Sequence, residues 1–216
     1  MFYTAPRIMK TDYLKIIFFK RLSQYTDNAT LINNTFSDLL NDYSAEQRSY
    51  HDLAHINHLL NLLEDNQFRI HDEEVLYFAI WFHDAIYNTW KTNNEEKSAD
   101  FAENILSQTA MSPVRVKKVV DYIKATKTHT SNGDNDLELF LDFDLSILGS
   151  EPPIYDVYTR QIREEFSSYP TFIYNRGRKK ALRHFLEKRY IFHTYEFRSK
   201  FEAQARGNIQ RELDDL

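Results

Sequence analysis

Residues 73–84 read Glu-Glu-Val-Leu-Tyr-Phe-Ala-Ile-Trp-Phe-His-Asp. Its apolar residues cover nearly every side of a helix, which predicts a helix over residues 73–82 that is central and buried. That helix delivers His83 and Asp84 from its C-terminal end. Neutral imidazole nitrogens and carboxylate oxygens are ligands of divalent cations, so the stretch predicts a metal site as well as a core helix.

The rest of the chain also favours helices. Only 4 Gly and 5 Pro occur in 216 residues, which is too little turn punctuation for a sheet-rich fold. Apolar spacing and capping residues predict ten helices. We expect them at residues 12–25, 31–43, 55–63, 73–82, 93–106, 113–126, 137–148, 154–168, 171–189 and 195–213. In the last of these helices, Glu202 and Arg206 are spaced to pair across one turn.

No repeat, low-complexity tract or linker marks a domain boundary, although residues 131–136 form the clearest loop. We therefore expect an all-α fold, a single-domain helical bundle over residues 1–216. The metal-site region is expected at about residues 46–150, with the C-terminal helices of residues 151–216 packed on it.

Composition excludes several classes of function. The formal net charge of −5 argues against a general nucleic-acid coat, and the absence of Cys excludes thiolate zinc sites and cysteine catalysis. No apolar run approaches the roughly 18 residues of a membrane span, and no signal-peptide pattern opens the chain. We expect a cytoplasmic protein with neither nucleic acid nor membrane among its partners.

Imidazoles and carboxylates occur at three separated places. The first is His51 and His55, which share one face if a helix runs through both; if His51 lies in the turn before the helix, it still overhangs the start of that helix. The second is His83-Asp84. The third is residues 141–145, where Asp142 and Asp144 are two positions apart. A helix turns these two about 200° from each other, so only one of them can point inward.

A metal ion at the meeting point of these helix ends can take His55, His83, Asp84 and one carboxylate of the third segment. Four such ligands leave one or two coordination positions for water and substrate, and this openness is typical of a catalytic site rather than a structural one. The ligand set suits manganese, iron, cobalt, nickel or zinc, whereas magnesium matches the imidazoles less well.

The ordered set resembles a known signature. His55, then His83-Asp84, then Asp144 is similar to the His…His-Asp…Asp signature of the HD superfamily of metal-dependent phosphohydrolases. The resemblance extends over almost the whole chain, to a bacterial subgroup of predicted HD phosphohydrolases. The stretches that carry it are residues 50–56, 81–87, 94–99, 142–149 and 201–208. The resemblance implies an all-helical fold, a divalent metal cofactor and hydrolysis of a phosphate ester or anhydride of a small phosphorylated compound, expected to be a nucleotide.

The resemblance also implies roles for individual residues. The Tyr-His-x-x-x-His start is similar to that of the cyclic-nucleotide phosphodiesterases, which makes His51 a general acid and His55 a metal ligand. Asp84 is a ligand, and either Asp84 or the final Asp orients the attacking water. Asp144 is chosen as the last ligand, because the final Asp of the family lies mid-helix before an apolar residue. His129 falls in a region that binds a second metal or the substrate phosphate in some HD enzymes.

Three further residues are expected at the rim of the site as substrate-binding groups. Arg48 suits a phosphate through bidentate hydrogen bonds. Lys127 and Glu96 are the other two, although Glu96 also fits the start of a helix, where the backbone dipole stabilises negative charge. The chain lacks the adjacent His-His pair of the di-iron oxygenase relatives, which disfavours oxygenation chemistry.

Two other classes of function stay open. The first is a non-catalytic sensor module of HD fold that binds metal and nucleotide, and the second is a helical partner-binding protein whose His and Asp only form hydrogen bonds. The sequence does not identify the substrate, the metal or the number of metals, and it leaves room for a homodimer.

Overall fold

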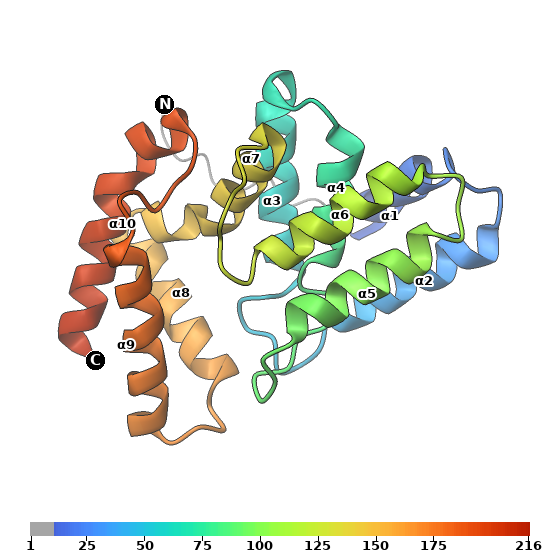
Figure 1. The fold of residues 1–216 in the computed structure, drawn as a ribbon. Helices are drawn as coiled ribbons and strands as arrows, with labels where there is room; N and C mark the ends of the chain where they lie inside the picture. Colours follow the sequence, from blue (N-terminus) through green and yellow to red (C-terminus); the bar gives the residue numbers. More distant parts are fainter. Residues whose placement is uncertain (1–10) are drawn as a thin grey trace. The chain divides into compact units, whose positions relative to one another are not determined.

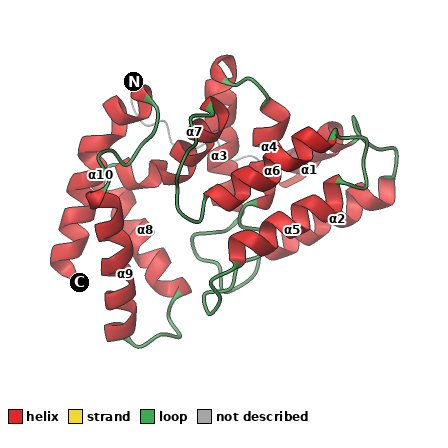
Figure 2. Ribbon diagram, in the orientation of Figure 1, coloured by secondary structure: helices red, strands yellow, loops and turns green. Residues whose placement is uncertain are grey.

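The computed structural model describes residues 11–216, and it is built from helices (Figures 1 and 2). The α-helices are α1 (Thr11–Leu22), α2 (Ala29–Tyr43), α3 (Leu53–Asn66), α4 (Glu73–Phe82), α5 (Asn94–Leu106), α6 (Pro113–Ala125), α7 (Asn135–Leu145), α8 (Pro152–Glu165), α9 (Thr171–Glu187) and α10 (Tyr195–Asp215). Two 3₁₀-helices, η1 (Gln67–Arg69) and η2 (Ser146–Gly149), complete the regular structure. No strand occurs within residues 11–216, so the all-α prediction is confirmed. In this range, no helix has the length and apolar character needed to cross a membrane.

The described chain forms two compact units. The first unit contains α1 to α6 and ends at Thr130, and the second unit begins at Ser131 and contains α7 to α10. The boundary coincides with the loop that the sequence marks most clearly. The organisation as one domain stays a prediction, and the expectation about an N-terminal signal concerns residues 1–10, which lie outside the described residues.

Helix α4 is the core of the first unit, as its apolar sequence predicts. Every residue from Val75 to Phe82 is buried, and α4 packs against α3, α5 and α6. Trp81 is fully buried, and its ring lies 5.4 Å from that of Phe18 and 5.8 Å from that of Phe36. The hydroxyl of Tyr43 donates to the Trp81 carbonyl at 3.0 Å. This aromatic packing fixes the end of α4, from which His83 and Asp84 follow.

A side-chain cap sets where α3 begins. The Asp52 carboxylate accepts hydrogen bonds from the backbone N–H of Ala54 at 2.8 Å and of His55 at 3.1 Å, which is the geometry of an N-cap. Helix α3 therefore starts at Leu53, and His51 lies in the turn before it. Of the two arrangements left open by the sequence, the structure has the one in which His51 and His55 do not share a helix.

The second unit departs from prediction at α7. One helix was expected over residues 137–148, but α7 ends at Leu145 and the chain tightens into η2. The Ser146 hydroxyl donates to the Phe143 carbonyl at 2.7 Å, and a Cβ at Gly149 would lie 2.5 Å from the Cβ of Phe201 on α10. A tight 3₁₀ turn with a glycine allows this close approach. The predicted pair within α10 is confirmed, with Arg206 Nε 2.7 Å from a carboxylate oxygen of Glu202.

Candidate metal site

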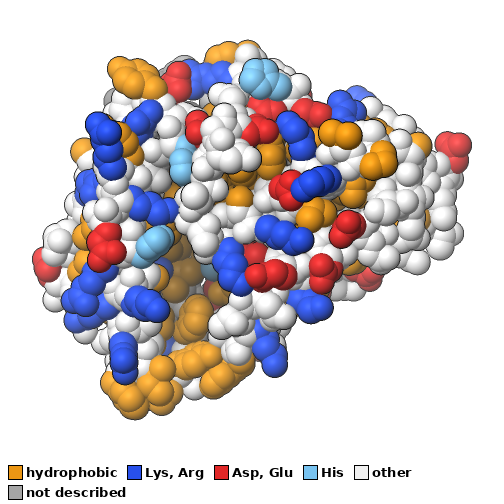
Figure 3. Space-filling view, in the orientation of Figure 1, with side chains coloured by type: hydrophobic (Ala, Val, Ile, Leu, Met, Phe, Trp, Pro, Cys, Tyr) orange, Lys and Arg blue, Asp and Glu red, His pale blue; other side chains and the backbone are white. Residues whose placement is uncertain are grey.

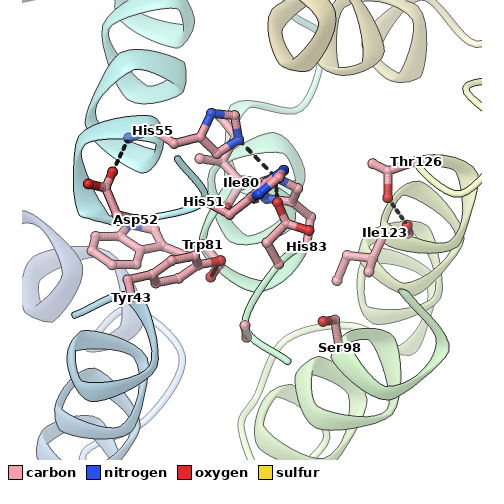
Figure 4. A network of polar contacts seen from close by, with 12 residues as sticks. Tyr43, His51, Asp52, His55, Ile80, Trp81, His83, Ser98, Ile123 and Thr126 are labelled. Carbon is pink, nitrogen blue, oxygen red and sulfur yellow. Dashed lines mark hydrogen bonds and ion pairs between the residues drawn. The ribbon is translucent and has the colours of Figure 1, made fainter. Parts of the chain in front are cut away.

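Two buried histidines face each other in the first unit. His55 lies in the first turn of α3, and His83 follows the last residue of α4. Their exposed fractions are 4% and 1%. The two Nε2 atoms are 3.3 Å apart, and Figure 4 shows the rings turned toward each other. The structure thus brings together two residues that are 28 positions apart in the sequence.

The carbonyl of Ile80 decides which nitrogen of His83 carries the proton. His83 Nδ1 lies 2.9 Å from Ile80 O, and because a carbonyl oxygen can only accept, Nδ1 must donate. In a neutral imidazole the other nitrogen then presents its lone pair, so His83 Nε2 is an acceptor. Metal-binding histidines are held in this way, with the second ring nitrogen donating to a carbonyl or carboxylate.

Asp84 brings a carboxylate to the same nitrogen. Its Oδ2 is 3.1 Å from His83 Nε2. With the proton on Nδ1, this contact joins two lone-pair atoms, which repel each other unless a cation lies beside both or His83 takes up a second proton. A divalent cation suits both atoms together with His55, and the donor set therefore fits such an ion. His55 and His83 are both buried and are close enough to share a metal ion.

Arg48 ties the segments around these ligands together. Its Nη1 donates to the carbonyls of His51 at 3.1 Å and of Asp84 at 2.6 Å, and its Nη2 donates to the carbonyl of Ala85 at 2.8 Å. The side chain is only 8% exposed, and its guanidinium lies 5.0 Å from the ring centre of Tyr43. Sequence reasoning assigned Arg48 to a substrate phosphate. The structure shows the guanidinium holding the backbone on both sides of the site, and a phosphate contact stays a prediction.

His51 lies beside the histidine pair but comes from the turn before α3. Its ring centre is 5.9 Å from that of His55 and 4.6 Å from that of Tyr87, at an angle of 32° to the Tyr87 ring. The side chain is half-buried. Figure 4 shows it in the same region as His55 and His83. Its role as an acid stays a prediction.

Ser98 is a residue to which sequence reasoning gave no role. Its hydroxyl accepts from the backbone N–H of Ile86 at 3.0 Å and lies 3.3 Å from the Ile86 carbonyl, to which it can donate. Ser98 is fully buried on α5, so it anchors the segment that follows His83 and Asp84 to a neighbouring helix. Its only sequence signal is its place within residues 94–99, one of the stretches that carry the family resemblance.

The expected rim residues form contacts of their own. Lys127 Nζ lies 2.5 Å from Glu96 Oε1 and donates to the carbonyl of Thr92 at 2.7 Å. The hydrogen bond between them lowers the pKa of the Glu96 carboxyl and raises that of the Lys127 ammonium. His129 is half-buried and has a φ of 48°, in the left-handed region that few non-glycine residues occupy. The structure thus pairs two of the three rim residues, and their substrate contacts stay predictions.

The second unit holds the two candidate aspartates of α7. The Asp142 carboxylate is fully buried and accepts from His193 N at 2.6 Å, Thr194 N at 2.8 Å and Thr194 Oγ1 at 2.6 Å. Burial raises the pKa of this carboxyl to about 6, against the opposing effect of these hydrogen bonds. Asp142 is therefore not a surface acid: it joins α7 to the segment that begins α10. Asp144 is half-buried.

Comparisons with protein-family models, with curated proteins and with solved structures found no match to this chain. The site therefore rests on the residues themselves. They define a helical protein with two buried histidines that face each other and an aspartate beside one of them, side chains of the kind that bind metal ions.

Proposed function

We propose that this protein is an HD-type metal-dependent phosphohydrolase that cleaves a phosphate ester or anhydride of a small phosphorylated compound, a nucleotide in our expectation. The observation that carries the proposal is the pair of buried histidines, His55 and His83, with the Asp84 carboxylate beside His83. Between His83 and Asp84, two lone-pair atoms lie 3.1 Å apart. A divalent cation resolves this juxtaposition and also supplies the chemistry of hydrolysis.

The proposed ligands are the ones that the sequence predicts, His55, His83, Asp84 and Asp144. The commitment of Asp142 to the start of α10 supports the choice of Asp144, because Asp142 already accepts three hydrogen bonds within its own unit. A divalent cation held by these ligands supplies Lewis acidity and an acidified water.

The other residues would handle protons and charge. Asp84 has a side chain that is 17% exposed, so its carboxylate can accept a hydrogen bond from the attacking water and orient it. A protonated His51, held against Tyr87, would donate its proton to the departing oxygen as general acid, and His129 is the alternative donor. Lys127, with Glu96, would meet negative charge on the phosphoryl group at the rim.

A phosphate-release screen tests this proposal. The parent protein is assayed with manganese, cobalt, nickel and zinc against nucleoside monophosphates, triphosphates and cyclic nucleotides. We expect turnover with at least one pair of metal and substrate. His83→Ala and Asp84→Asn should abolish it, whereas His184→Ala, which alters an exposed histidine on α9, should not.

His51→Asn separates acid catalysis from metal binding. We expect it to keep the metal and to lower kcat by about 10²- to 10⁴-fold. Turnover retained in both His83→Ala and Asp84→Asn would contradict the proposed site. Tight nucleotide binding without product across the screen would favour the sensor module instead.

A further inference from the structure

Helix α9 carries a row of unpaired positive charges on its outer face. The helix holds five Lys or Arg residues and a single acidic residue, Glu187, although the whole chain has a formal net charge of −5. Its buried positions, Tyr174 and Leu182, are eight apart and face the core of the second unit. The outward positions follow the i, i+4, i+7, i+8, i+11 spacing of one helix face. They are Phe172, Arg176, Lys179, Lys180 and Arg183.

The four cations of this face differ from most basic residues elsewhere. Lys97, Lys117 and Arg211 each form an ion pair with an acid. By contrast, none of the four cations at positions 176, 179, 180 and 183 has a hydrogen bond, ion pair or ring contact to any residue in the range 11–216. An ordinary solvated helix face alternates both signs of charge, so this row is a local concentration of positive potential.

Apolar side chains continue the same face at its N-terminal end. Phe172 is 75% exposed and Ile173 is 44% exposed. Figure 3 shows hydrophobic side chains gathered where α9 begins and Lys and Arg side chains along the helix. From Phe172 to Arg183 the face is roughly 16 Å long. Exposed large apolar groups next to cations on one helix face are typical of helices that lie at a membrane interface.

We propose that the outer face of α9 binds an anionic lipid surface, with Phe172 and Ile173 inserted among the acyl chains and the four cations on the headgroup phosphates. Single-stranded RNA would also attract the cations. However, RNA-binding surfaces add aromatic platforms for base stacking, and Ile173 has no ring, whereas an aliphatic and an aromatic residue together suit lipid. The proposal is independent of the metal site. It extends beyond the expectation of no membrane partner, which rested on the lack of a membrane-spanning segment.

Vesicle sedimentation tests the proposal on the full chain. The probes are vesicles of phosphatidylcholine alone and vesicles of phosphatidylcholine with phosphatidylglycerol. We expect binding to the anionic vesicles only, and weaker binding as salt rises. Each cation near an anionic surface contributes roughly a fivefold gain in partitioning, so Lys180→Gln with Arg183→Gln should reduce binding by more than tenfold. Phe172→Ser should reduce it by about tenfold while leaving the charge unchanged.

The matched control removes two cations from another exposed helix face, through Lys117→Gln with Lys124→Gln on α6. We expect it to bind vesicles like the parent, and all variants should keep the helical circular dichroism of the parent. Equal loss in the control and in the α9 variant would overturn the proposal, because binding would then follow total charge. Binding to single-stranded RNA but not to anionic vesicles would overturn it in favour of a nucleic-acid surface.

Discussion

One backbone hydrogen bond sets the chemistry of the candidate site at the scale of single residues. The Ile80 carbonyl accepts a hydrogen bond from His83 Nδ1, which leaves the lone pair of Nε2 beside the Asp84 carboxylate. The sequence predicts His55, His83 and Asp84, because their order and flanks carry a recognisable pattern. It cannot predict the Ile80 contact, since any residue at position 80 supplies a carbonyl. The partners of Arg48 were equally hidden, because two of them lie about 36 positions further along the chain.

Arg48→Lys tests whether the guanidinium positions the ligand segment. A lysine ammonium cannot reach three carbonyls with the fixed fork of a guanidinium. We expect the affinity for manganese, measured by titration calorimetry, to fall by about 10- to 100-fold. The free energy of unfolding should fall by about 2 kcal/mol.

The control for this variant is Arg160→Lys, which alters an exposed arginine on α8. It should match the parent in both measurements. If Arg48→Lys bound manganese as tightly as the parent but bound phosphate more weakly, the guanidinium would be a substrate contact, as the sequence suggested, rather than a positioning group.

At the scale of elements, the start of a helix could be predicted from the sequence better than its end. Ser112 caps α6 by accepting from the Arg115 N–H, and the helix begins at Pro113, the start that was predicted for it. The end of α7 was predicted three residues too late, because its tightening depends on Phe201 of α10. The role of Asp142 was missed for the same reason. Its partners at residues 193 and 194 reach it only through the fold of the second unit.

Asp142→Asn tests the link between α7 and α10. Both carboxylate oxygens accept from donors, so an amide group would place an N–H against an N–H or O–H and lower the free energy of unfolding by about 2 kcal/mol. Burial raises the pKa of Asp142 to about 6 in the folded protein, from an ordinary value of 3.8. The folded state therefore binds this proton more tightly than the unfolded state. The contribution of this proton to the free energy of unfolding is complete below about pH 4 and is lost as the pH rises to about 6.

Urea unfolding of the parent and of Asp142→Asn between about pH 4 and pH 7 measures this effect. The advantage of the parent should be about 2 kcal/mol near pH 4 and should be lost by pH 7. An advantage that grew with pH would mean that the hydrogen bonds to the carboxylate outweigh its burial.

At the scale of the whole molecule, composition was the main basis for predicting the fold class. The low Gly and Pro counts, with ten periodic apolar segments, give the all-α class. The division into two compact units has no compositional signal apart from the loop at residues 131–136, because each unit continues the same helical pattern. The positive electrostatic potential of the outer face of α9 could not be predicted either. Only the fold shows which cations elsewhere in the chain pair with acids.

Metal binding should stabilise the whole molecule by mass action. At a free metal concentration of about 100 times Kd, the gain in free energy of unfolding is about 2.7 kcal/mol, which raises Tm by roughly 5–10 °C for a chain of this size. Differential scanning calorimetry with and without manganese measures the shift. His83→Ala should show no shift. The same rise in the variant as in the parent would place the stabilising ion elsewhere.

The most direct measurement is metal content by elemental mass spectrometry, on protein purified without a chelator or a histidine tag. The parent is compared with His83→Ala, Asp84→Asn and the surface control His184→Ala. We expect about one metal ion per chain in the parent and in the control, and none in the two site variants, with the helical signal intact in all four. An absence of metal from the parent after soaking with manganese and zinc would contradict the site.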